Sequence, residues 1–163
     1  MNMFREMRRK KQLLTKDETV KILNACTSGV LGVNGDDGYP YTVPISYVYE
    51  DGKIFIHCAK EGHKIDSIKR DNKVSFSVIE KDDIVQEEFT SYFRSVSIFG
   101  KARILTDDSE KEHALTLIIK KYSPDFADER LKRVKDDTNR TCLIEINVEH
   151  MTGKAAIEII NKK

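Results

Sequence analysis

The chain has 163 residues, a length that fits one domain with a hydrophobic core of its own. Its 28 basic residues nearly balance 27 acidic ones, and a net charge of +1 gives no reason to expect nucleic acid or an anionic membrane as a partner. Three cysteines without a CxxC pair are typical of a reducing compartment, and no apolar run is long enough to span a bilayer. We therefore expect a cytoplasmic protein that binds neither nucleic acid nor membrane.

The N-terminal part of the chain predicts a basic segment followed by a helix. Residues 8–11 are all basic, but no aromatic residue is interleaved and no second basic block follows, so residues 1–12 are better explained as a solvated segment than as a nucleic-acid contact. Thr15 and Glu18 have the spacing of a helix-capping box, and apolar residues then recur at helical spacing. We expect this helix to end at Gly29.

From Gly29 onward the pattern changes to the two-residue period of β-strands. Residues 29–33 alternate, residues 34–38 are rich in turn-forming residues, and residues 39–49 alternate again, which predicts a hairpin. Pro44 cannot donate a ladder hydrogen bond, so its strand must lie at an edge, at a bulge or where the ladder is interrupted. Such a gap would free backbone groups for a ligand; an edge strand without a ligand is the alternative.

The segment Gly52–Asp71 predicts an anion site. Residues 54–59 alternate as a strand, Gly62 breaks the pattern, and apolar residues three apart then indicate a short amphipathic helix with Lys64 in its first turn. The free N–H groups of such a helix, its dipole and the Lys64 ammonium would converge where a phosphate could bind. The alternative, a surface lysine beside a glycine turn, is favoured by the local sequence alone.

The second half of the chain contains further strands and helices. Strands are predicted over three segments, 73–79, 92–104 and 142–149, with a bulge or bend at Gly100. Helices are predicted over 107–122 and 125–134. Residues 80–88 are expected to form a charged surface loop. Thr152–Lys154 should break the last strand, which we expect to resume over residues 155–160.

These elements predict a mainly β (α+β) fold. About six strands, mostly joined by hairpins and Gly-rich turns, favour a closed antiparallel β-barrel with flanking helices over a doubly wound sheet, and residues 1–163 are expected to form a single domain. The chain contains no G-x-G-x-x-G fingerprint and no Walker loop.

Metal and hydrolytic sites are not indicated. His57, Cys58 and His63 resemble a ligand set, but His57 and Cys58 are neighbours on one predicted strand and therefore point to opposite faces. We expect no metal site. No serine lies in a G-x-S-x-G context, so a hydrolytic triad has no support.

One motif carries a family resemblance. The pattern F-x-H-x-A-x-x-G-x-K is filled by Phe55, His57, Ala59, Gly62 and Lys64. Further matching segments are Arg8–Lys10, Val43-Pro44, Tyr92–Val96, Phe99–Ala102 and Thr152–Lys154. Over residues 8–154 the chain resembles the nitroimidazole-resistance (Nim-type) branch of the pyridoxamine 5′-phosphate oxidase-like, flavin-binding split-barrel proteins.

The resemblance implies a six-stranded split barrel that forms a homodimer, with FMN in two clefts between the subunits. Residues 42–46 would run along the flavin, the turn with Gly62 and Lys64 would take the phosphate, and His57 would take part in redox chemistry. Residues 92–96 would lie near the ring, contributed by the partner subunit. The implied cofactor-binding residues are Thr42, Val43, Pro44, Ile45, His57, Cys58, Ala59, Gly62, His63, Lys64, Tyr92, Ser95 and Val96.

The implied function is that of an FMN-dependent oxidoreductase of Nim type, which reduces a small acceptor such as a nitroaromatic compound. The alternative is a flavin or haem carrier without turnover on the same barrel. For His57, a structural histidine in the barrel is the alternative to a redox role. The chain departs from the family pattern in two places. The C-terminal arginine motif of true pyridoxamine phosphate oxidases is absent, and Cys58 stands where the family often has a smaller or hydroxyl residue, so one expected contact to the phosphate is not assigned.

Overall fold

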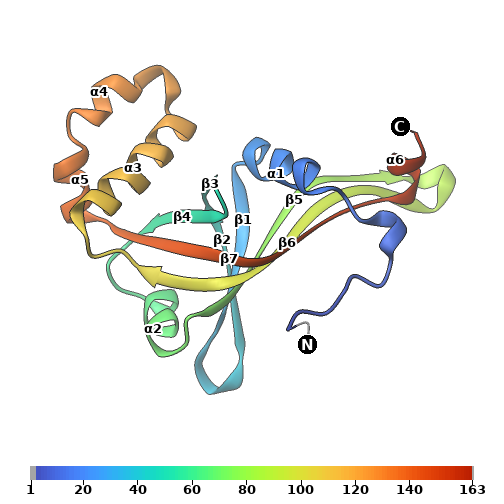
Figure 1. The fold of residues 1–163 in the computed structure, drawn as a ribbon, viewed down its shortest axis with the longest axis horizontal. Helices are drawn as coiled ribbons and strands as arrows, with labels where there is room; N and C mark the ends of the chain where they lie inside the picture. The colour runs from blue at the N-terminus through green and yellow to red at the C-terminus, as the bar shows by residue number, and fades with distance from the viewer. Residues whose placement is uncertain (1–2, 163) are drawn as a thin grey trace.

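One antiparallel sheet organises the molecule, a computed structural model that describes residues 3–162 (Figure 1). Its seven strands follow the spatial order β2-β1-β5-β6-β7-β4-β3. The strands are β1 (Ser28–Asn34), β2 (Pro40–Ser46), β3 (Val48–Glu50), β4 (Lys53–Cys58), β5 (Lys73–Val85), β6 (Thr90–Ile104) and β7 (Cys142–Ala155). The helices are α1 (Lys16–Ala25), α2 (His63–Arg70), α3 (Asp108–Tyr122), α4 (Ala127–Leu131), α5 (Val134–Arg140) and α6 (Ile157–Asn161).

The sheet has seven strands instead of the expected six because the segment 39–49 is divided at Tyr47. The first part, β2, pairs with β1, whereas the second part, β3, pairs with β4 at the other end of the strand order. The side chain of Tyr47 is fully buried and donates a hydrogen bond to the Leu23 carbonyl at 2.7 Å. Since one residue joins the two edge strands, the sheet must curl until its edges meet, as in a split barrel.

Two hydrophobic cores lie against this sheet. The larger core contains the inward residues of most strands together with the apolar faces of α1 and α2. The smaller core lies between β4 and the α3–α5 helices, which form a separate group at one end of the molecule in Figure 1. Phe55 belongs to the smaller core while its neighbours Ile54 and Ile56 belong to the larger one, as the alternation of a strand requires.

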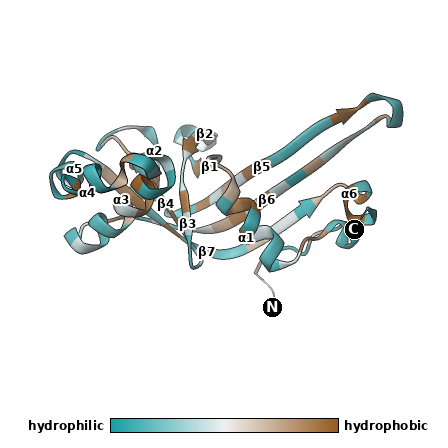
Figure 2. Cartoon of the chain, turned by 90° about the horizontal axis from the view of Figure 1, so that it is seen from above, coloured by the Kyte–Doolittle hydropathy of each residue, from teal (hydrophilic) through white to brown (hydrophobic). Residues whose placement is uncertain are grey.

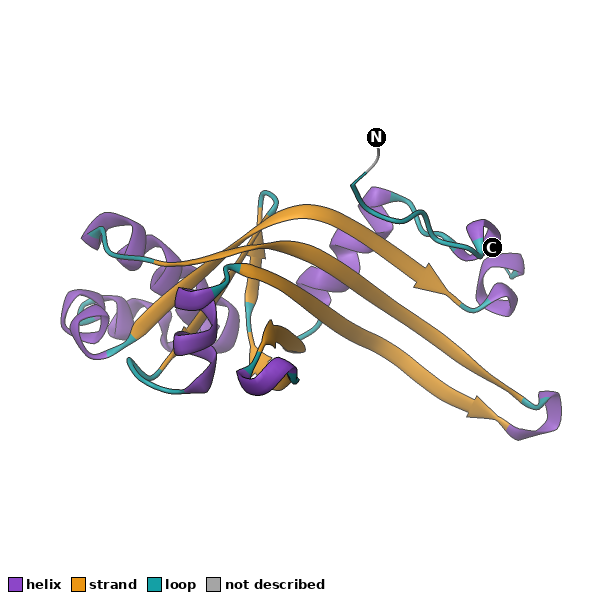
Figure 3. Cartoon of the chain, turned by 90° about the horizontal axis from the view of Figure 1, so that it is seen from below, coloured by secondary structure: helices purple, strands orange, loops and turns teal. Residues whose placement is uncertain are grey.

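The distal halves of β5 and β6 form a two-stranded arm. Figure 2 shows this arm projecting from the rest of the molecule, and Figure 3 shows the two strands running side by side to a short helical turn. The predicted surface loop over residues 80–88 is therefore wrong, because β5 continues to Val85 and pairs with β6 as far as Thr90. Charged residues are tolerated in the arm because most of their side chains there remain accessible to water.

Glycines explain two further outcomes in the sheet. The predicted irregularity at Gly100 is confirmed: the register against β7 shifts between Phe99 and Gly100, where a side chain would collide with the Asn147 carbonyl. The predicted break at Thr152–Lys154 is wrong, because β7 continues through it. Gly153 is needed there because any side chain would meet Thr19 of α1.

Helix boundaries also differ from the predictions in three places. The capping box of α1 is confirmed, but α1 ends at Ala25 and Gly29 already belongs to β1. The single helix expected over 125–134 is two short helices, α4 and α5. The strand expected over 155–160 is helix α6, which follows β7 after one residue.

Candidate functional site

The structure confirms the helix start that the sequence predicted after Gly62, at the N-terminus of α2. Gly62 precedes the helix with a φ of +132°, a conformation that side chains rarely adopt. No side chain among the described residues caps this end, so the first N–H groups of the helix are open to a ligand. Lys64 lies in the first turn and is half-buried, whereas Ile65 and Ile68 anchor the helix in the larger core.

Polar and aromatic contacts hold this helix against the β1–β2 connection. The His63 ring stacks on Tyr41 with ring centroids 4.2 Å apart, and its Nε2 lies 3.5 Å from a carboxylate oxygen of Asp36. Arg70, at the other end of α2, binds Asp36 at 3.1 Å and donates to the Asn34 carbonyl at 3.0 Å. The start of β2 and the open end of α2 are therefore held next to each other.

Of the three positions that Pro44 allowed, an edge, a bulge or an interrupted ladder, the strand β2 occupies an edge. It pairs with β1 alone, and Thr42 and Pro44 point away from the core and are exposed. Val43 and Ile45 are half-buried and pack on the larger core. The outward residues and the unpaired edge of this strand are available to a ligand lying beside the α2 N-terminus.

Cys58 lies near Lys64 at the end of β4. It is half-buried and stands opposite Cys142 of β7 in the strand register. Burial raises the pKa of the Cys58 thiol to about 11, and the neighbouring Cys142 adds to the rise while the Lys64 ammonium opposes it. Cys58 is therefore a neutral thiol near pH 7 and lacks the thiolate character of a reactive cysteine.

His57 lies on the opposite face of β4 from Cys58. It is exposed and lines a cavity of 570 Å³ beneath α3–α5, whose other lining residues include Tyr122, Phe126 and Arg130. Ala59 follows the strand and is exposed. Within one chain, the structure does not bring His57 together with the α2 N-terminus, and its redox role stays a prediction.

The three predicted residues of β6 are also separated from α2 within one chain. Tyr92 lies on the arm, where its hydroxyl donates to Glu88 at 2.7 Å and accepts from Lys162 at 3.1 Å. Ser95 is half-buried next to the arm, and the side chain of Val96 is buried in the larger core. In Figure 1 the arm extends to the right, whereas α2 lies left of centre, below the sheet.

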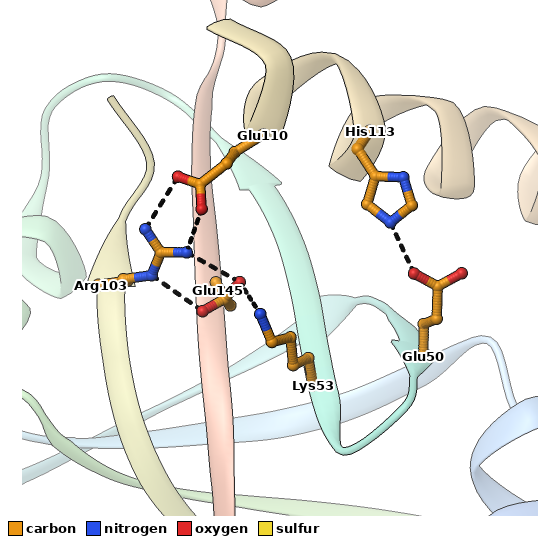
Figure 4. Close-up of polar contacts among 6 residues, drawn as sticks. All are labelled: Glu50, Lys53, Arg103, Glu110, His113 and Glu145. Carbon is orange, nitrogen blue, oxygen red and sulfur yellow. Dashed lines mark hydrogen bonds and ion pairs between the residues drawn. The ribbon is translucent and has the colours of Figure 1, made fainter. Parts of the chain in front are cut away.

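A buried ion network near β4 was not foreseen from the sequence. Glu145 of β7 is 6% exposed and accepts hydrogen bonds from Lys53 at 3.0 Å and from Arg103 at 2.9 and 3.1 Å (Figure 4). Burial pushes the pKa of Glu145 upward, but Arg103 and Lys53 outweigh it, and the pKa is lowered. The only signal in the sequence is a glutamate in an apolar run, and its partners come from strands distant in the chain.

All the residues labelled in Figure 4 except Arg103 line a second cavity. It has a volume of 480 Å³, and the Nε2 of His113 lies 2.6 Å from Glu50 at its rim. Acidic and basic groups are paired with one another here, since Arg103 also binds Glu110 at 2.6 and 2.9 Å. The network joins β4, β6, β7 and α3, and we interpret it as structural.

Over residues 3–162, no cluster of three or more His, Cys, Asp or Glu residues is arranged to hold a metal ion. In the same range, no helix has the length and apolar character needed to cross a membrane.

The sequence comparison identifies the family. The model of the family described as pyridoxamine 5′-phosphate oxidase matches residues 15–155, which include the whole sheet and helices α1 to α5. The chain therefore belongs to the pyridoxamine 5′-phosphate oxidase family, as the F-x-H-x-A-x-x-G-x-K motif predicted. No curated protein matches the chain in sequence.

Solved structures with the same fold include proteins of several kinds. A candidate 5-nitroimidazole antibiotic resistance protein from Bacteroides thetaiotaomicron has 25% identity and a TM-score of 0.76, over 88% of this chain and 86% of that one. An FAD-binding protein from Mesorhizobium loti has 26% identity and a TM-score of 0.60, and the match covers 89% of this chain and 97% of that one. An FAD- and haem-binding protein from Mycobacterium smegmatis, with 17% identity and a TM-score of 0.73 over 94% and 80%, shares the fold.

Proposed function

We propose that the protein is an FMN-dependent oxidoreductase of Nim type, which works as a homodimer and reduces a small acceptor such as a nitroaromatic compound. The observation that carries this proposal is the open N-terminus of α2, with Lys64 in its first turn beside the edge strand β2. The similarity to the candidate nitroimidazole resistance protein supports the choice of acceptor. Bound FMN would supply the redox chemistry, with electrons from a reduced nicotinamide or another donor.

The residues present fit a flavin phosphate. The uncapped N–H groups after Gly62 and the positive end of the α2 dipole favour an anion, and the Lys64 side chain adds a full charge. Pro44 and Thr42 would face the ribityl chain and the ring from the exposed side of β2. His63, held by Tyr41 and Asp36, would fix the orientation of the phosphate turn.

The separation of Tyr92 from Lys64 supports a site made from two chains. Both residues can lie near one flavin only if the arm that carries Tyr92 belongs to the partner subunit. A projecting two-stranded ribbon is only marginally stable in water, which also favours a packed partner. The arm carries exposed apolar side chains, with Ile84 at 70% and Phe89 at 98% exposure.

The second candidate is a flavin or haem carrier without turnover. The FAD- and haem-binding protein from Mycobacterium smegmatis shares the fold, and the cavity beside His57 offers an imidazole with apolar walls. The absorbance of the purified protein separates the candidates: flavin bands between about 350 and 480 nm support FMN, whereas a sharp Soret band supports haem. Steady-state reduction of a nitro compound that depends on NAD(P)H distinguishes an oxidoreductase from a carrier.

The test of the phosphate site is Lys64→Ala. Loss of one charge-assisted hydrogen bond costs roughly 1.5–3 kcal/mol, so the Kd for FMN should rise about 10- to 150-fold. The matched control is Lys120→Ala, which removes an exposed lysine from α3. FMN affinity is measured by flavin fluorescence, and an unchanged Kd for Lys64→Ala would exclude the assignment.

A further inference from the structure

A cavity distinct from the open end of α2 lies where α2, α3, α5 and the start of β7 meet. Its volume of 360 Å³ is within the range of small-molecule pockets, about 300–1,000 Å³. Three segments far apart in the sequence, 60–69, 104–111 and 138–142, supply the walls. The lining residues are Lys60, Ile65, Lys69, Ile104, Leu105, Thr106, Lys111, Thr138, Asn139, Thr141 and Cys142.

The charge of this lining has one sign. Three lysines line the cavity, and no aspartate or glutamate does. The Lys60 ammonium donates to the Asn139 carbonyl of α5, and Lys111 pairs at 2.7 Å with Asp108, a side chain that is 82% exposed. For Lys69, no ion pair or hydrogen bond is found within the part of the chain that the structure describes.

The remaining lining residues provide hydrogen bonds and an apolar wall. The hydroxyls of Thr106 and Thr141 and the amide of Asn139 can donate to an anion. Ile104 and Leu105 add an apolar part to the lining, which suits the body of an organic molecule. A cationic cavity lined by both hydrogen-bond donors and hydrocarbon favours an amphipathic anion over a bare ion.

The cavity is not the predicted phosphate turn of the flavin site. Lys69 lies five residues after Lys64 on α2, which places it about 140° around the helix and about 7.5 Å further along it. Lys69 belongs to the last turn of the helix, whereas Lys64 belongs to the first. The two lysines therefore point in different directions.

We propose that this cavity binds an organic phosphate, with the phosphoryl group on Lys69, Lys60 and Lys111 and the organic body on Ile104 and Leu105. Lysine is a common phosphate ligand in proteins because its ammonium is a compact charge with three donors. Binding would give the Lys69 ammonium the ionic partner that it lacks among residues 3–162.

The experiment is calorimetric titration of the purified protein, saturated with FMN, with 5′-AMP and separately with inorganic phosphate. We expect both probes to bind, AMP more tightly than phosphate because its base and ribose contact the apolar wall. In Lys69→Gln the Kd for AMP should rise at least tenfold, and in the double variant Lys60→Gln/Lys69→Gln binding should be lost. Lys120→Gln serves as the matched control.

Three results would overturn the inference. The first is that the wild-type protein does not bind AMP at millimolar concentration. The second is that Lys69→Gln leaves the affinity for AMP unchanged. The third is that AMP binds without FMN but no longer binds at saturating FMN. The last result would place AMP in the flavin site. FMN content is followed by absorbance in the same samples: Lys69→Gln should retain wild-type FMN, so failure of the flavin assignment is recognised independently.

Discussion

The buried carboxylate Glu145 is the most sensitive test of the electrostatic interpretation. Glu145→Gln keeps the shape of the side chain but removes its charge and one of its two acceptor oxygens. The three hydrogen bonds from Lys53 and Arg103 are charge-assisted, and removing one partner of a fully buried pair costs about 3–5 kcal/mol. The side chains of Lys53 and Arg103 are 43% and 47% exposed and can regain water, so we expect a smaller loss, about 2–3 kcal/mol.

The assay is urea unfolding at several pH values. Since the pKa of Glu145 is lowered in the folded protein from its ordinary value of 4.5, its contribution is fully present above that value and is lost as the pH falls through the folded pKa. The difference between wild type and variant should therefore be about 2–3 kcal/mol at pH 7 and should shrink as the pH falls below the ordinary carboxyl pKa and through the lowered pKa of Glu145. A difference below about 0.5 kcal/mol at pH 7, or one that does not change with pH, would refute the reasoning.

The matched control for this experiment is Glu110→Gln. Glu110 binds the same guanidinium of Arg103, but its side chain is 43% exposed. Exposed ion pairs contribute only about 0–1 kcal/mol, so this variant should lose far less stability than Glu145→Gln. Equal losses in the two variants would show that burial of Glu145 has no special effect.

Three further substitutions test the fold. Gly100→Ala should destabilise the protein by about 1–3 kcal/mol in urea unfolding, because the added Cβ collides with the Asn147 carbonyl, and wild-type stability would contradict the bulge. Tyr47→Phe removes the hydrogen bond to the Leu23 carbonyl and should cost about 1–3 kcal/mol by the same assay; a neutral result would mean that this carbonyl finds another donor. Thr15→Ala removes the N-cap of α1 and should cost about 1 kcal/mol, seen as a lower Tm, whereas Thr15→Ser should be nearly neutral.

Local chemistry made several elements predictable from the sequence. The capping box at Thr15 and the break at Gly62 act on their own backbone, and each indicated a helix start that the structure confirms. Pro44 limited its strand to an edge, a bulge or an interrupted ladder, and the structure has the edge. Alternation located the strands because one face of each is buried. The motif from Phe55 to Lys64 also identified the family, which the match over residues 15–155 confirmed.

Other features depended on residues that are distant in the chain. The segment 80–88 lacks an apolar pattern, and only pairing with β6 makes it a strand. Gly153 looked like a strand break, although its real role is to make room for Thr19 of α1. In each case a neighbour brought by the fold supplies the hydrogen bonds or the steric limit that decides the local structure.

The sequence by itself determined the sheet-rich fold class, the family and the open helix end that carries Lys64, because these depend on periodicity and on short-range backbone chemistry. Only the tertiary structure decided which residues share a site. It placed His57 beside a cavity beneath α3–α5, put Tyr92 on an arm away from Lys64, and gathered three lysines around a cavity between α2 and α5. The physical reason is that strand pairing and helix packing, which join distant segments, set the positions of side chains in space.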